Sequence, residues 1–321
     1  MRALRISPSC IQHVDAKFRG DNTLVKKLFE LRYHYISLCN TDLCIKQDRE
    51  IVKLAIETDS YDYRYAHYTL RTDKELTMLA VSRNGSLLAL ADTSLRQDRE
   101  IVMAAVRNDP LALEYASYDL KDDYEVVEMA IKRSAEALKH ASKRLRSNRD
   151  LVLKAFKHGP DISYNAFSYI CDSLKKDKEI VLNAVKNNGL SLQYAHSSLQ
   201  CDREIVLAAV KQNGEALEFA SEELRKDSEI IREAILQNGK ALDYVCGKID
   251  KPLIILAAKT HYQLAESIDR DLLNDDDIAL EMLQCNSYDF RNMDKRIRYN
   301  RNYYLLPSRD NPIPFITPLP N

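Results

Sequence analysis

The sequence lacks an excess of charge of either sign. Its 321 residues include 47 Lys and Arg against 48 Asp and Glu. A basic excess is what draws a protein to nucleic acid or to an anionic membrane. The balance therefore argues against DNA binding as the main role and disfavours nucleic acid as a partner.

Paired cysteines and long apolar runs are also missing. The seven cysteines are odd in number and scattered, without a CxxC pair, which is typical of free thiols in a reducing compartment rather than of a disulfide framework or a zinc site. No apolar run approaches the roughly 18–20 residues of a membrane-spanning helix, and the first 20 residues contain no signal-peptide core. We expect a cytoplasmic protein without a transmembrane segment or a metal.

Common catalytic and nucleotide-binding motifs are absent as well: the sequence contains no GxxxxGK[ST], GxGxxG, HExxH or GxSxG. We therefore expect no cofactor and no catalytic residue. An enzyme would need a nucleophile pair such as Cys with His. The available residues are Cys171, His158, His196 and Cys201, and nothing in the sequence fixes their geometry.

What the sequence does contain is a tandem repeat. An Asp recurs every 25 residues at 48, 73, 98 and 123, then at 177, 202 and 227, with Asn148 in one place. The same phrase follows it, as in DREIVKLAI from Asp48 and DREIVLAAV from Asp202. A period of this length is typical of stacked supersecondary units. Each repeat is named below by its first residue, which is position 0.

The first half of each repeat predicts an amphipathic helix. Asp at position 0 is a good N-cap, and Glu at +2 lies where the helix dipole favours negative charge. Apolar residues follow at +3, +4, +7 and +8, for example Ile205, Val206, Ala209 and Val210, which form one helical face. Asn-Gly at +11 and +12 predicts a C-cap with a left-handed Gly.

The second half predicts another helix, with Leu at +15, Ala at +18 and Leu at +22, and usually an aromatic residue at +17. Leu120, Leu199 and Leu224 occupy +22 and are expected in the core. Each helix is too short to be stable alone, so neighbouring repeats must supply the stability. The predicted fold is an all-α solenoid of 25-residue helical hairpins.

Three regions follow from this pattern. Residues 1–47 form an N-terminal cap, in which Asp21 opens an atypical first repeat; residues 48–286 form the array, with looser repeats from Asp250 and Asp275; and residues 287–321 form a last helix and an extended Pro-rich tail. The array is interrupted at 157–172, where His158-Gly159-Pro160 breaks the helix and four extra residues enter. We expect the segment from His158 to Asp172 to protrude or to bend the array.

The phrase D-[RK]-E-[IV]-V-x-x-A-V-x-x-N-G-x-[AS]-L-x-[YF]-A-x-x-x-L resembles the repeat of the domain of unknown function numbered four-one-one-six. The match is closest at residues 177–245 and extends over residues 48–147. The resemblance implies an α-helical repeat without assigned activity, so no catalytic residue carries over. It also implies the setting of intracellular bacteria that inject effectors, in which case the protein would act in a host cytosol.

The leading hypothesis is a non-enzymatic helical repeat that binds another protein, since repeat solenoids offer extended binding surfaces. Binding should depend on exposed residues that differ between repeats. The candidate binding residues are Tyr61, Tyr63, Tyr68, Tyr164, Phe167 and Tyr169. The alternative for these aromatics is that they fill local gaps left by the missing Asn-Gly turns. Two alternatives stay open: an enzyme with a site at 157–172 or at the ends, and an RNA-binding solenoid that uses the +17 aromatics as a stacking ladder.

Overall fold

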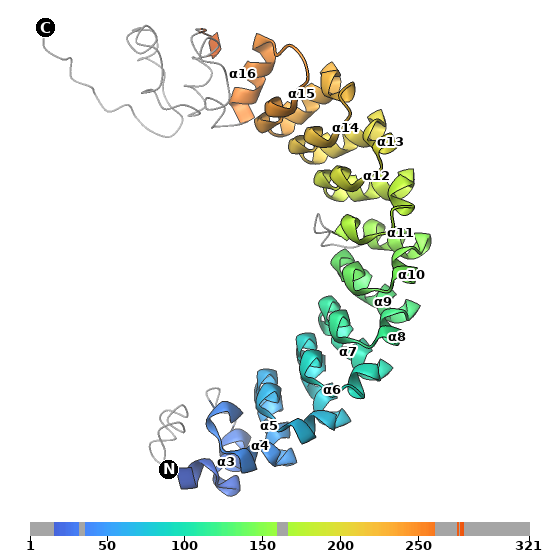
Figure 1. The fold of residues 1–321 in the computed structure, drawn as a ribbon. Helices are drawn as coiled ribbons and strands as arrows, with labels where there is room; N and C mark the ends of the chain where they lie inside the picture. Colours follow the sequence, from blue (N-terminus) through green and yellow to red (C-terminus); the bar gives the residue numbers. More distant parts are fainter. Residues whose placement is uncertain (1–15, 32–35, 159–165, 261–274, 276, 279–321) are drawn as a thin grey trace, which may run out of the picture. The chain divides into compact units, whose positions relative to one another are not determined.

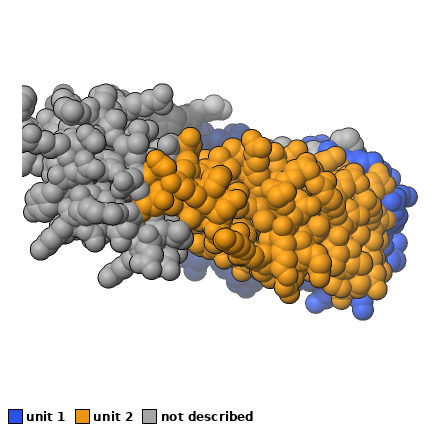
Figure 2. Space-filling model, turned by 90° about the horizontal axis from the view of Figure 1, so that it is seen from above, with its two compact units in different colours: residues 1–171 blue, residues 172–321 orange. Residues whose placement is uncertain are grey.

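The computed structural model describes residues 16–31, 36–158, 166–260, 275 and 277–278. The chain divides into two compact units, unit 1 (residues 1–171) and unit 2 (residues 172–321), which Figure 2 shows in different colours. All regular structure in these described residues is helical, and helices pack against their neighbours in series without any strand (Figure 1). The prediction of an all-α solenoid is confirmed.

In both units a ten-residue α-helix alternates with shorter helical pieces. The α-helices of unit 1 are α2 (Ala16–Arg19), α3 (Asn22–Glu30), α4 (Leu43–Gln47), α5 (Arg49–Thr58), α6 (Lys74–Arg83), α7 (Arg99–Asn108), α8 (Tyr118–Lys121), α9 (Tyr124–Ile131), α10 (Lys143–Arg146) and α11 (Arg149–His158). Those of unit 2 are α12 (Lys178–Asn187), α13 (Ser197–Gln200), α14 (Arg203–Gln212), α15 (Ser228–Gln237) and α16 (Lys251–Thr260).

Between them lie 3-10 helices. Unit 1 contains η2 (Leu38–Asn40), η3 (Ser60–Tyr65), η4 (Tyr68–Thr72), η5 (Gly85–Leu90), η6 (Leu95–Gln97), η7 (Pro110–Tyr115), η8 (Ala135–His140) and η9 (Ala166–Tyr169). Unit 2 contains η10 (Leu174–Lys176), η11 (Gly189–Tyr194), η12 (Gly214–Phe219), η13 (Leu224–Lys226) and η14 (Gly239–Tyr244). Within each unit the long α-helices pack in one row and the six-residue 3-10 helices in a second.

The repeated Asp begins each long helix as predicted. The Asp202 carboxylate accepts hydrogen bonds from the backbone N–H groups of Glu204 (3.0 Å) and Ile205 (3.3 Å), and Asp48, Asp98, Asp177 and Asp227 do the same in their repeats. These N–H groups have no partner within the helix, so the cap stabilises its first turn. The apolar face at +3, +4, +7 and +8 is fully buried in α14.

The second half of the repeat differs from the predicted helix. It is split at Ala +18, which is extended: Ala91 has φ −67° and ψ 151°. A six-residue 3-10 helix precedes this break, and a piece of three to five residues follows it. Spacings of 3 residues also match the 3-10 helix, in which side chains at i and i+3 share a face, so the apolar pattern could not distinguish the two forms.

The Asn-Gly pair ends the long helix as predicted, with Asn188 as the C-cap of α12, but the predicted left-handed Gly is wrong. Gly85, Gly189 and Gly214 do not adopt a left-handed conformation; Gly247 is the one described glycine that does. A Cβ at Gly189 would lie 2.3 Å from the carbonyl oxygen of Ala209 in the next repeat. Gly at +12 therefore permits close contact between repeats. The preceding Asn188 caps the 3-10 helix by accepting from the Leu190 N–H.

A ladder of ion pairs crosses from several of the repeats to the next, each time from a cation at +1. Arg49 at +1 binds Asp73 (Nε–Oδ2 2.7 Å) and Glu75 of the following repeat. The same pairing joins Lys74 to Asp98 and Glu100, Arg99 to Asp123 and Glu125, Lys178 to Asp202 and Glu204, and Arg203 to Asp227 and Glu229. Hydrogen bonds from Lys53 and Arg49 lower the pKa of Glu75 to about 2. The recurring acids thus serve capping and stacking.

Several expectations concern particular core residues or regions. Leu120 and Leu199 are buried as predicted, whereas Leu224 is only half-buried. Asp21 caps α3 by accepting from the Leu24 N–H at 3.0 Å. Residues 159–165, which make up the central part of the segment expected to protrude, lie outside the described residues, and so does the predicted tail at 287–321.

Candidate functional site

The three tyrosines of the early cluster lie in different environments. Tyr61 and Tyr68 are exposed, by 52% and 72%, whereas Tyr63 is fully buried and its hydroxyl lies 2.8 Å from the Thr77 Oγ1 on α6. The expectation that Tyr63 is an exposed binding residue is wrong. Tyr63 stands at +15, where other repeats place the core Leu, for example Leu88. The repeat register contained this information.

The second cluster behaves in the same way. Phe167 also occupies the +15 position, once the four extra residues are counted, and it is fully buried with its ring 5.7 Å from that of Phe156. Its expected exposure is therefore wrong as well. Tyr169 is half-buried, and its carbonyl oxygen accepts from Arg146 at 3.3 Å. Tyr164 lies outside the described residues.

The two exposed tyrosines belong to one neighbourhood. The guanidinium of Arg64 lies 5.4 Å from the ring centroid of Tyr61, within the range of a cation–π contact. The Arg64 carbonyl oxygen accepts a 2.8 Å hydrogen bond from the guanidinium of Arg71, which shares η4 with Tyr68. The hydrogen bond from Arg71 to the Arg64 backbone thus links the segments that carry Tyr61 and Tyr68.

Backbone hydrogen bonds between repeats position this neighbourhood within a longer surface. The N–H of His67 donates to the carbonyl oxygen of Lys46 (2.9 Å), and that of Ser117 donates to Arg96 (3.0 Å). The same bond joins Asp92 to Arg71, Ser142 to Lys121 and Cys171 to Arg146 in unit 1. Each bond joins two fixed repeat positions. The acceptor is the second-last residue of one repeat, and the donor is the residue at +19 of the next repeat, directly before its fifth-last residue.

We define the edge strip as the fifth-last and second-last residues of successive repeats in unit 1. The fifth-last residues are Leu43, Tyr68, Thr93, Tyr118 and Lys143, and the second-last residues are Lys46, Arg71, Arg96, Lys121 and Arg146. Leu43, Tyr68 and Tyr118 are 60%, 72% and 90% exposed. Large apolar side chains this exposed, at the same position in several repeats, mark a candidate interaction surface.

The second-last residues of the strip are all cations. None of the five has an ion pair within the described residues of unit 1. Arg71 donates to the Arg64 carbonyl oxygen, Arg96 donates to the Thr93 hydroxyl at 3.3 Å, and the Lys121 ammonium lies 5.8 Å from the Tyr118 ring centroid. Their positive charges therefore have no ion-pair partner among the described residues, although Arg96 makes a small contribution to the lowered pKa of Asp92.

A hollow of about 510 Å³ opens between two repeats of the strip. Tyr68 and Arg71 line it from one repeat, and Thr93 and Arg96 from the next. Asp92 also lines it, but its carboxylate accepts from the N–H and hydroxyl of Ser94 (2.9 and 2.7 Å), which lower its pKa. The hollow offers an aromatic ring and two cations to a bound group.

Unit 2 has different side chains at the same positions. Its fifth-last residues are Asp172, Ser197 and Glu222, and its second-last residues are Lys175, Gln200 and Arg225. Asp172 pairs with Lys175 at 2.7 Å, and Glu222 pairs with Lys226 at 2.5 Å. The pKa of Glu222 is lowered chiefly by Lys226 and to a smaller degree by Arg225. In unit 2, Lys175 thus forms an ion pair with a fifth-last acid, whereas Arg225 has no ion pair among the described residues.

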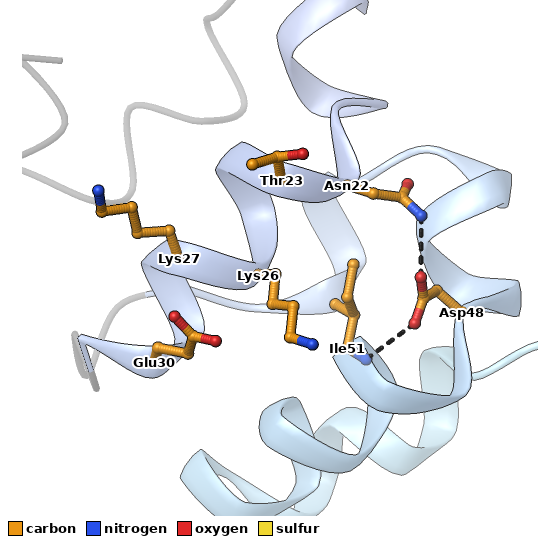
Figure 3. A pocket seen from close by; sticks show the side chains of 7 residues that line it. All are labelled: Asn22, Thr23, Lys26, Lys27, Glu30, Asp48 and Ile51. Carbon is orange, nitrogen blue, oxygen red and sulfur yellow. Dashed lines mark hydrogen bonds between the residues drawn. The ribbon is translucent and has the colours of Figure 1, made fainter.

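A second hollow, of about 400 Å³, lies at the N-terminal end of the array (Figure 3). It is lined by α3 residues that include Asn22 and Lys26, together with Asp48 and Ile51. Asn22 stands at the ladder position +1 and donates to Asp48 at 2.8 Å. Since Asn is shorter than Arg or Lys, the ladder is thinner here and leaves the hollow open.

The residues considered for an enzyme lie in different local settings. His196 caps α13, where its Nδ1 lies 2.9 Å from the Ser198 hydroxyl, and Cys201 is exposed at the other end of that helix. Cys171 is half-buried, and the side chain of His158 lies outside the described residues. The described residues contain no group of three or more metal-ligating side chains, and none of their helices is long and apolar enough to cross a membrane.

Comparison with known proteins finds one family. The model of a domain of unknown function (DUF4116) matches the chain six times, at residues 48–96, 73–121, 98–146, 123–165, 148–200 and 202–249. These matches together extend over more than half of the chain. Neither a curated protein nor a solved structure matches it.

Proposed function

Because this chain belongs to the DUF4116 family, whose function is unknown, we propose from its geometry that it is a helical-repeat binding module. In this proposal the edge strip of unit 1 holds a protein partner. The observation that carries it is the exposure of Leu43, Tyr68 and Tyr118 at one repeat position, where unit 2 has polar residues.

Stacking does not require these three side chains. The core of each repeat is complete without them, since the apolar face of the long helix and the Leu, Tyr or Phe at +15 are buried in both units. The equivalent residues of unit 2 are exposed Asp172, Ser197 and Glu222, and they occupy the same fold. Exposed aromatic residues are frequent anchors of protein interfaces, and the backbone bonds between repeats hold them on a rigid scaffold.

Site-specific photo-crosslinking tests the proposal. A photoreactive phenylalanine derivative at Tyr68 or Tyr118 should give a discrete protein adduct in extracts of the native cell. The same group at Ser197 or Glu222 is the matched control, because these residues occupy the equivalent position in unit 2. Equal adduct formation at all four positions, or none at Tyr68 and Tyr118, would show that the strip is not the binding surface.

The other predicted roles gain no support from the described residues. An effector role in a host cell and a cytoplasmic location have no structural feature behind them. Of the +17 aromatics, Tyr115 and Tyr194 are half-buried, which leaves little ring surface for a base, whereas Tyr65 is 37% exposed. Tyr61 remains a predicted binding residue at the margin of the strip, and Tyr169 remains one in the irregular repeat.

A further inference from the structure

We infer that the partner segment held by the edge strip is an extended acidic peptide with an acidic residue at every third position. This inference rests on the proposed function, since it names the chemistry of the partner at the same surface. It starts from the second-last cations Lys46, Arg71, Arg96, Lys121 and Arg146, which lack ion pairs within the described residues of unit 1.

The charges are arranged as a row with one cation in each repeat. Each cation is held in place through its backbone, because its carbonyl oxygen accepts from the N–H of the next repeat, as for Lys46 with His67 and Lys121 with Ser142. Ionised side chains without partners complement an opposite charge on a binding partner and also steer its approach. The row therefore fits a ligand with regularly spaced carboxylates.

The spacing of the row selects the conformation of the ligand. Packed helices lie about 8–10 Å apart, so successive cations are separated by about that distance. A polyproline II segment has 3 residues per turn and rises about 3.1 Å per residue, which places every third side chain on one face about 9 Å apart. An acidic residue at every third position would meet one cation in each repeat, and apolar residues between them would reach Tyr68 and Tyr118.

Acidic residues within the strip favour a peptide over RNA. Asp92 lines the hollow between Arg71 and Arg96, and the exposed Asp119 follows Tyr118. The hydrogen bonds from Ser94 lower the pKa of Asp92, so it is ionised at neutral pH. A continuous phosphate backbone would meet these carboxylates, whereas a peptide can place a neutral side chain opposite each of them.

Fluorescence anisotropy tests the inference with the full chain. The probe is a labelled peptide of about 15 residues that repeats Glu-Pro-Leu, and the comparison probes are the same peptide with Gln in place of Glu and a uridine oligonucleotide. We expect binding of the Glu peptide that weakens with added salt, as ion pairs at a surface do, and at least about tenfold weaker binding of the Gln peptide.

Variants assign the binding to the strip. The double variant Lys46→Glu with Lys121→Glu should bind the Glu peptide about tenfold more weakly, since two attractive charge interactions become repulsive. Neither lysine side chain makes a hydrogen bond or ion pair in the described residues, so the fold is retained. The charge-matched control is Lys186→Glu with Arg232→Glu, at exposed positions of unit 2, which should leave binding within about twofold.

Three results would overturn the inference: no binding of the Glu peptide at low salt, equal loss in the control variant, or tighter binding of the oligonucleotide. Photo-crosslinking at Tyr68 and Tyr118 distinguishes a wrong partner chemistry from a wrong interaction surface. A protein adduct at these positions without peptide binding would retain the interaction surface and reject an acidic partner.

Discussion

Units 1 and 2 are built from the same repeat and differ at one edge. Both carry the Asp caps, the +1 to +2 ladder of ion pairs and the backbone bonds between repeats. At the fifth-last position, however, unit 1 exposes Leu43, Tyr68 and Tyr118, whereas unit 2 has Asp172, Ser197 and Glu222. Since unit 2 stacks without apolar residues there, stacking does not account for their presence in unit 1.

The largest expected effect distinguishes the buried Tyr63 of unit 1 from the exposed Tyr68 by their contributions to stability. Tyr63→Ala should lower the free energy of unfolding by about 3–5 kcal/mol, because it leaves a cavity and removes the partner of Thr77. Tyr68→Ala should change it by less than about 0.5 kcal/mol. Chemical denaturation measures both, and a large loss for Tyr68→Ala would show that the strip is part of the core.

The second test concerns the close contact that both units share. A Cβ at Gly85 in unit 1 or Gly214 in unit 2 would lie 2.3 Å from the carbonyl oxygen of the next repeat, Ala105 or Ala234. Gly85→Ala and Gly214→Ala should therefore each destabilise by about 2–3 kcal/mol, the usual cost of overpacking. The control is Lys186→Ala on the exposed face of α12. Unequal losses in urea unfolding would mean that the two units do not stack by the same contact.

The sequence predicted the long helices well because each is determined locally. An Asp cap, a Glu in the first turn and an apolar face at +3, +4, +7 and +8 all lie within ten residues, as in α14 from Arg203 to Gln212. The break at Ala +18 and the close approach of Gly189 to Ala209 depend on the neighbouring repeat. Contacts of that kind leave no signature within a single repeat.

The candidate site was predicted only in part for a related reason. Size and aromaticity drew attention to Tyr63 and Phe167, although the repeat register already placed both at the +15 core position. The strip itself needed two further facts: that the second-last cations lack ion pairs, and that backbone bonds hold them beside the next repeat. Neither is visible in the sequence.

The third test uses position +14, where most repeats have a small or apolar residue and each unit has one polar exception. In unit 1 this is Asp62, which is 2% exposed and accepts from the Ser37 hydroxyl (2.5 Å) and the Leu38 N–H (3.1 Å). Burial raises the pKa of Asp62 to about 6, against the hydrogen bonds, with a small contribution from Asp59. The folded state thus favours the protonated acid.

The contribution of Asp62 to the stability of unit 1 should therefore fall as the pH rises. The contribution of protonated Asp62 is complete below about pH 4 and is lost as the pH passes through about 6, a change on the order of 2 kcal/mol. Asp62→Asn keeps an acceptor for Leu38 and should remove this pH dependence. Chemical denaturation at pH values between about 4 and 7 gives the free energy of unfolding of both proteins. If the two curves of unfolding free energy against pH ran parallel, Asp62 would titrate normally.

The smallest expected effect is at the matching position of unit 2. Ser191 is fully buried and its hydroxyl has no hydrogen-bond partner among the described residues, whereas Ala112, Ala137, Ala216 and Ala241 occupy the same position in other repeats. A buried polar group without a partner costs free energy that an apolar group of similar size does not. Ser191→Ala should therefore stabilise the protein by about 1 kcal/mol, measured as a higher midpoint of urea unfolding.

Ser198→Ala is the control, since the Ser198 hydroxyl is exposed and lies 2.9 Å from the His196 Nδ1. This control variant should not be more stable than the unmodified protein. If Ser191→Ala destabilised instead, its hydroxyl would have a partner in solution, and the two polar exceptions at +14 would both be satisfied.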